Sequence, residues 1–262
     1  MSVTAKFVYS FSEGNKELKD LLGGKGANLA EMMRIGIPVP PGFTITTEAC
    51  KEYLAKGTAP IELEVQITKA LRELEDEMQK RLGDKEDPLL VSVRSGAKFS
   101  MPGMMETILN VGLNDNSIEG LIKQTNNPRF AWDAYRRLIQ MYGKTVLDIE
   151  GSKFAAELEK AKAAQGVKID AELSVDSLKQ LVAVFKKIIL DSTGREFPQD
   201  PREQMDNSMR AVFDSWNTDR AKLYRRRERI ADDLGTAVNI GTMVFGNMGE
   251  DSGTGVCFTR NP

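Results

Sequence analysis

The sequence has 262 residues, 36 basic and 38 acidic side chains, a formal net charge of −2 and 41% hydrophobic residues. This composition is typical of a soluble globular protein that can bury its own core, and its balanced charge argues against binding nucleic acid or a membrane surface through bulk charge. No apolar stretch is long enough to span a membrane, and the two distant cysteines, Cys50 and Cys257, are expected to be reduced in a cytoplasmic protein.

The chain contains no histidine. Histidine is the usual general base near neutral pH and the commonest metal ligand, so its absence excludes Ser-His-Asp and Cys-His nucleophiles and His-ligated zinc. The remaining side chains and the backbone amides are suited to positioning phosphate groups and neutralising their charge.

The first part of the chain mixes strands and helices. We expect strands over residues 7–9, 42–46, 89–93 and 107–111, and helices over residues 23–34, 47–54 and 60–82. From about Asp115 onward, apolar residues recur every four positions, for example at Phe130, Ala134 and Leu138, which predicts an all-helical stretch.

Further helices are expected over residues 204–216 and 220–230, followed by strands over 236–245 and 255–259 that a glycine-rich turn joins into a hairpin. The pattern predicts an α+β fold. Residues 115–197 are expected to form an all-helical insertion into this fold.

Glycines surround a lysine in the segment LLGGKGANL, at the start of the first predicted helix. Free amides at a helix N-terminus beside the Lys25 ammonium would bind an anion. The segment is not a Walker A loop, because no strand precedes it and Gly26 stands where Ser or Thr is required. The alternative is a glycine-rich helix start with a solvated lysine.

The segment VSVRSGAKFSMPGMMET places Arg94 at the end of a buried strand, before a flexible loop. An arginine there can direct its guanidinium at phosphate oxygens, with Ser95 and the Gly103 amide as neutral donors. The three loop methionines suggest a loop that closes over a ligand. The alternative is a structural ion pair for Arg94 and methionines packed in the core.

Two other segments have simpler interpretations. The glycine-rich stretch 246–255 offers Thr254 as a phosphate donor, but on this segment alone an ordinary hairpin connection is the preferred interpretation. The basic run RRRER at 225–229 has no aromatic stacking platform, so a solvated or salt-bridged helix face is expected rather than nucleic-acid binding.

Taken together, these segments resemble the pyruvate, phosphate dikinase family. The resemblance rests on LLGGKGANLAEM, PLLVSVRSGAKFSMPGMMETILNVG, PRFAWDAYRRLIQMY and the stretch from Gly235 to Pro262, in this order. SMPGMM followed by an acidic residue and TILN is specific to this family. The pyruvate, water dikinases and rifampicin phosphotransferases share the GGKG loop and the Arg-Ser strand end but continue differently.

The resemblance implies an incomplete ATP-grasp-like nucleotide-binding domain within a larger enzyme. It divides the chain into a first α/β subdomain (residues 1–114 and 198–234), a helical insertion (115–197) and the beginning of a third subdomain (235–262). That enzyme interconverts ATP, phosphate and pyruvate with AMP, pyrophosphate and phosphoenolpyruvate through a phosphohistidine on another domain. It implies that Lys25 and Arg94 contact the phosphates, together with the loop residues Gly103, Met104 and Thr107. It also assigns Thr254 and Gly255 to a phosphate loop and places Met243 near the adenine.

One position departs from the family pattern, because Gly241 stands where glutamine is expected. The resemblance further implies Mg²⁺ bound by carboxylates beyond Pro262, a catalytic histidine outside this sequence, and a homodimer formed through regions outside it. No catalytic residue and no metal ligand is assigned within the chain, and no dikinase turnover is expected from it alone. The alternatives are a related pyruvate, water dikinase or a nucleotide-binding module without catalysis.

Overall fold

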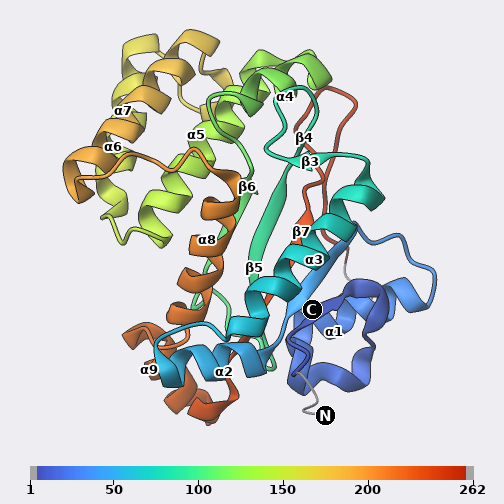
Figure 1. The fold of residues 1–262 in the computed structure, drawn as a ribbon. Coiled ribbons are helices and arrows are strands. Elements are labelled where there is room, and N and C mark those ends of the chain that lie inside the picture. Colours follow the sequence, from blue (N-terminus) through green and yellow to red (C-terminus); the bar gives the residue numbers. More distant parts are fainter. Residues whose placement is uncertain (1–4, 258–262) are drawn as a thin grey trace.

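A computed structural model describes residues 5–257 of the chain. It shows an α+β fold built on a five-stranded antiparallel sheet, with strand order β1-β2-β7-β5-β6 (Figure 1). The strands of this sheet are β1 (Val8–Ser10), β2 (Gly42–Ile45), β5 (Val91–Ala97), β6 (Thr107–Val111) and β7 (Thr236–Thr242). A short parallel pair lies beside it, formed by β3 (Arg81–Leu82) and β4 (Pro88–Leu89).

Helices supply the rest of the regular structure. They are α1 (Lys19–Arg34), α2 (Thr47–Lys56), α3 (Ile61–Met78), α4 (Ser117–Thr125), α5 (Pro128–Thr145), α6 (Gly151–Gln165), α7 (Val175–Thr193), α8 (Pro201–Ser215) and α9 (Asp219–Glu228). The predicted helices are confirmed, with shifted ends. No helix among residues 5–257 combines the length and the apolar character that crossing a membrane requires.

The two faces of the sheet differ in chemistry. Val93 and Ile240 are paired on one face and are fully buried, whereas Arg94 and Asn239 are paired on the other face. This alternation follows from the two-residue period of a strand. The sheet therefore presents its polar residues to α1 and its apolar residues to the core.

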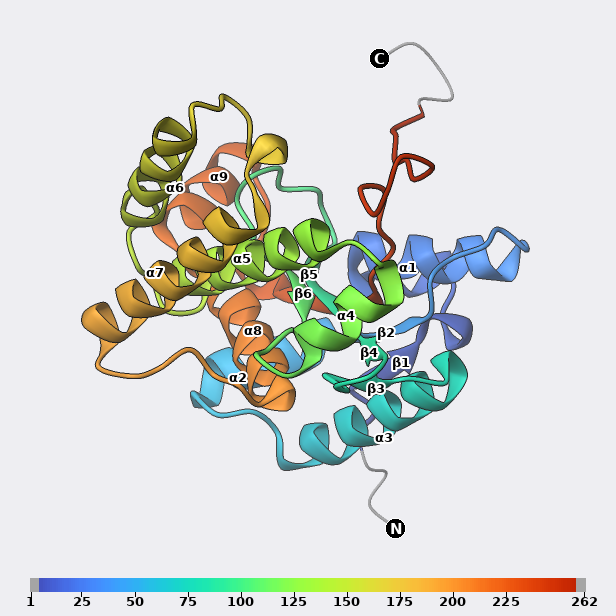
Figure 2. The same cartoon turned by 90° about the horizontal axis from the view of Figure 1, so that it is seen from above.

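The place of β7 differs from the expected domain division. Residues 236–242 were assigned to the beginning of a third subdomain, but β7 lies at the centre of the sheet, between β2 and β5. The expected hairpin after β7 is wrong for the part of it that the structure describes, because residues 255–257 form no strand and residues 258–259 lie outside the described range. The last described residues extend away from the sheet and helices (Figure 2). Local alternation and turn residues do not show which strand a segment will pair with.

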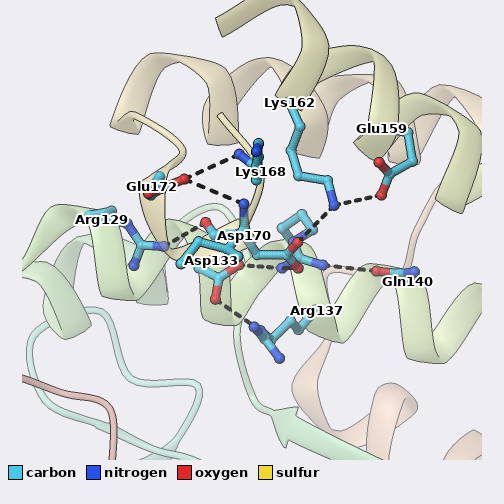
Figure 3. Close-up of polar contacts among 11 residues, drawn as sticks. Arg129, Asp133, Arg137, Gln140, Glu159, Lys162, Lys168, Asp170 and Glu172 are labelled. Atoms are coloured by element: carbon cyan, nitrogen blue, oxygen red, sulfur yellow. Dashed lines mark hydrogen bonds and ion pairs between the residues drawn. The ribbon is translucent and has the colours of Figure 1, made fainter. Parts of the chain in front are cut away.

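Residues between 115 and 197 are helical, with α5 packed against both β6 and α7. A buried polar cluster stabilises this region (Figure 3). Arg136, whose side chain is only 3% exposed, forms ion pairs with Asp133 and, at 3.2 Å, with Asp170. The cluster thus joins α5 to the short helical turn Asp170–Glu172. The division of this region into a separate insertion stays a prediction.

Candidate functional site

Close packing of glycines brings α1 onto the polar face of the sheet. Gly23 has φ of 67° and interrupts the helix, so a new helical segment begins at Gly24. A Cβ atom on Gly23 would overlap the carbonyl oxygen of Gly96, and a Cβ on Gly26 would lie 2.8 Å from Thr44 Oγ1 and 2.9 Å from Asn239 Oδ1. The glycines therefore let the start of this helical segment lie directly against β2, β5 and β7.

The resulting geometry favours an anion. The first amides of a helix lack intrahelical acceptors and carry the positive end of the helix dipole. Lys25 lies in this first turn, and Arg94 faces it from β5. Arg94 does not end its strand as expected, because β5 continues to Ala97 and pairs Arg94 with Thr107 and Asn239.

Lys25 and Arg94 have no compensating anion within residues 5–257: neither side chain forms a hydrogen bond or an ion pair there. Surrounding protein withdraws the Lys25 ammonium from water, and the Arg94 guanidinium repels it, so the pKa of Lys25 is lowered. Both side chains keep exposed surface, which moderates these effects. The structural ion pair considered for Arg94 is thus absent from the described part of the chain, and two adjacent cations are left facing the same space.

Two neighbouring hollows share Lys25 and Leu29 in their walls. The hollow of about 590 Å³ extends from α1 to the loop of residues 98–106 and includes Ser95, Gly103 and Thr107 in its wall. The other, of about 340 Å³, has a more apolar wall that includes Phe11, Val39 and Pro40 and ends at Arg94, Asn239 and Gly241. A polar hollow beside an apolar one is suited to a ligand with an anionic part and an uncharged part.

The methionines of the loop have a structural role. Met101 is buried and packs with Trp216 and Ala221, and Met104 and Met105 pack partly against the same group. The alternative of methionines packed in the core is therefore correct for Met101. Met105 also contributes to the wall of the 590 Å³ hollow. The loop therefore packs against Trp216 and Ala221 on one side and lines the hollow on the other.

The structure brings only some of the predicted residues together. Lys25, Arg94, Gly103 and Thr107 line the two hollows, but Met243 packs against the core, and its neighbours Thr242 and Val244 line the smaller hollow instead. Thr254 and Gly255 are exposed and line neither hollow, and their assignment stays a prediction, as does that of Met243.

Sequence reasoning missed Asn239, which lies beside Arg94 in the wall of the smaller hollow and is buried. Its side-chain Oδ1 accepts a hydrogen bond from Thr44 Oγ1 at 2.9 Å, while Nδ2 has no partner. An asparagine within an otherwise apolar strand pattern is the signal that would have indicated it, because an amide is costly to bury.

The described residues do not form a Mg²⁺ site in this region. Hard cations prefer oxygen ligands, carboxylates above all, but no Asp or Glu lines either hollow. Across residues 5–257, no three or more His, Cys, Asp or Glu side chains are grouped so as to hold a metal ion. These residues therefore fit an anion and not a metal ion.

Known proteins are similar to this chain in sequence over nearly all of its length. The family model described as "Pyruvate phosphate dikinase, AMP/ATP-binding domain" matches residues 19–65 and 58–262. The chain is 54% identical to pyruvate, phosphate dikinase of Clostridium symbiosum over 260 residues, which are 98% of this chain and 30% of that protein. It is 52% identical to the chloroplastic enzyme of Mesembryanthemum crystallinum, covering 100% of this chain and 28% of that protein.

The rice protein named "Pyruvate, phosphate dikinase 2" is 54% identical over 251 residues, 96% of this chain. The chain spans about 30% of the length of these relatives. The family match covers the glycine helix start, Arg94 and the loop after it, which are the features that form the anion-binding geometry. The chain therefore belongs to the pyruvate phosphate dikinase family, and its residues correspond to the AMP/ATP-binding domain of that family.

Proposed function

We propose that this chain forms the phosphate-facing wall of an ATP-grasp-like nucleotide site in a pyruvate, phosphate dikinase. The whole enzyme would interconvert ATP, phosphate and pyruvate with AMP, pyrophosphate and phosphoenolpyruvate. The observation that carries the proposal is a pair of cations, Lys25 and Arg94, that have no partner among residues 5–257 and lie beside a glycine-rich helix start.

Phosphoryl transfer depends on positioning and charge neutralisation more than on covalent chemistry by the protein. Lys25 would contribute a point charge, Arg94 a planar fork that can bind two phosphate oxygens, and the amides after Gly23 neutral donors. The apolar wall of the smaller hollow would receive the adenosine part. Mg²⁺ would arrive with the nucleotide phosphates, and no step is assigned to it here, because the hollows offer it no carboxylate.

Calorimetric titration of the 262-residue chain with ATP and with adenosine tests the proposal. Lys25→Ala and Arg94→Ala should each weaken ATP binding by about ten- to hundredfold, as the loss of a charge-assisted hydrogen bond predicts. Lys160→Ala removes an exposed lysine that pairs with Glu157 on α6 and should leave ATP binding unchanged. ATP affinities that are equal in all three variants would refute the assignment of the site.

The chain contains no histidine, so it has no residue that can form the proposed phosphohistidine. We expect no phosphoenolpyruvate from the purified chain when it is incubated with ATP, phosphate, pyruvate and Mg²⁺. Phosphoenolpyruvate detected by a coupled assay, and absent with heat-denatured chain, would contradict this part of the proposal.

A further inference from the structure

The short stretch from Met105 to Thr107 separates two hollows. Met105 and Thr107 line the 590 Å³ hollow beside Lys25, whereas Glu106 lines another hollow, of about 540 Å³, formed with α5, α8 and α9. This arrangement follows from the alternation of side chains along extended backbone. A contact that fixes the Glu106 side chain in one hollow therefore also fixes how Met105 and Thr107 line the other hollow.

Glu106 is held by groups from three other elements. Its carboxylate forms an ion pair with Arg220 of α9, and Thr145 Oγ1 at the end of α5 donates a hydrogen bond to Glu106 Oε2 at 3.3 Å. Its carbonyl oxygen accepts a hydrogen bond at 3.4 Å from the amide of Ser95, the residue after Arg94. The Glu106 side chain is 22% exposed and that of Arg220 44%, so the ion pair is partly exposed to water.

The loop before Glu106 has few other attachments. Gly103 has φ of 73° with open space around it, and Pro102 and Gly103 are exposed. At its other end the loop is tied to the start of α1 by an ion pair between Lys98 and Asp20. The loop is thus held by one charge pair at each end and, between them, by the packing of its methionines against Trp216 and Ala221.

We infer that Glu106 is a positioning residue for the anion site: through Arg220 and Thr145 it sets the place of Met105, Thr107 and the adjoining strand that carries Arg94. Glu106 does not line the hollow that contains Lys25, so it acts on the ligand only through these neighbours. The inference rests on the proposed function, because it requires that phosphate groups bind in that hollow.

The test compares the binding of ATP and of adenosine to variants of the 262-residue chain by calorimetry. Glu106→Gln keeps the shape and the hydrogen bond to Thr145 but removes the charge, and it should weaken ATP binding by about two- to fivefold, the range for a partly exposed ion pair. Adenosine binding should not change. Glu106→Arg should weaken ATP binding further, and the pair Glu106→Arg with Arg220→Glu should restore it at least in part.

Glu150→Gln is the matched control: Glu150 lines the same 540 Å³ hollow, but within residues 5–257 its carboxylate accepts one hydrogen bond alone, from Ser152 Oγ at 2.5 Å, and forms no ion pair. It should bind ATP as the unchanged chain does. Thermal unfolding of each variant shows whether the fold is retained, and a purely structural role would lower the melting temperature without changing the ratio of ATP to adenosine affinity.

The inference is overturned when Glu106→Gln binds ATP as tightly as the unchanged chain, when it loses ATP and adenosine affinity by the same factor, or when the reversed pair binds no better than Glu106→Arg alone. If the unchanged chain binds no ATP at all, the proposed function fails, and this inference fails with it. If this inference alone fails, the unchanged chain still binds ATP, and the Lys25→Ala variant still binds ATP more weakly than the unchanged chain.

Discussion

Replacing Gly23 by alanine should lower the free energy of unfolding more than replacing a glycine whose Cβ position is open. Gly23 has φ of 67° and ψ of 174°, a region that is essentially restricted to glycine and costs another residue about 1–3 kcal/mol. The new Cβ would also overlap the carbonyl oxygen of Gly96, which α1 and β5 can relieve only by moving apart. Such overpacking typically costs about 1–3 kcal/mol, so we expect a loss of about 2–6 kcal/mol in the free energy of unfolding.

Urea denaturation followed by circular dichroism measures this loss, and Gly36→Ala provides the control. Gly36 also has positive φ, at 82°, but a Cβ there would meet no atom within 4 Å. It should therefore lose only a backbone contribution of about 1–2 kcal/mol. The difference between the two variants isolates the contact between α1 and β5.

The reasoning is refuted when Gly23→Ala and Gly36→Ala lose the same free energy of unfolding. A second consequence concerns binding. Because the helix that carries Lys25 would move away from the strand that carries Arg94, Gly23→Ala should weaken ATP binding even under conditions in which the variant is fully folded, and Gly36→Ala should not.

Two further predictions concern charged side chains. Because burial and Arg94 lower the pKa of Lys25, its charge opposes folding at neutral pH; Lys25→Met should raise the free energy of unfolding at pH 7 while weakening ATP binding. This gain is present below the lowered pKa and should disappear as the pH rises past the ordinary value of 10.5; a gain that persists there, measured by urea denaturation across this range, would contradict the cause given. Arg136→Met removes the buried partner of Asp133 and should cost about 3–5 kcal/mol, whereas Arg137→Met, with a half-exposed side chain, should cost about 1 kcal/mol or less. Equal melting temperatures for these two variants would show that burial does not decide the difference.

The sequence predicted the elements of the fold better than their arrangement. Apolar periodicity and turn residues located the helices and most strands, because these signals are local. Nothing in the sequence indicated that residues 236–242 would lie between β2 and β5, because strand pairing depends on contacts between residues that are up to almost two hundred positions apart in the chain.

Long-range contacts also changed the interpretation of two arginines, Arg225 and Arg94. Arg225 belongs to a basic run expected to be a solvated or salt-bridged helix face, and it does pair with Asp232. Its side chain, however, is buried against the Trp216 ring, with the guanidinium carbon 4.1 Å from the ring centroid. Arg94 was expected to have either a phosphate role or an ion pair, and only the folded arrangement shows that no carboxylate reaches it among the described residues.

The glycines of the segment LLGGKGANL are therefore required by the packing of α1 on the sheet, and any contact with a ligand comes in addition. Gly23 and Gly26 are required where they are because Gly96, Thr44 and Asn239 lie directly beneath them, whether or not a ligand is bound. That contact sets the distance between two cations that repel one another and have no anion near them in the described part of the chain. The sheet thus holds Lys25 and Arg94 in an arrangement that is unfavourable in the empty chain, and an anion that entered between them would remove this repulsion. Because this relief lowers the dissociation constant, we expect phosphate-bearing ligands to stabilise the folded chain more than adenosine does at the same free ligand concentration.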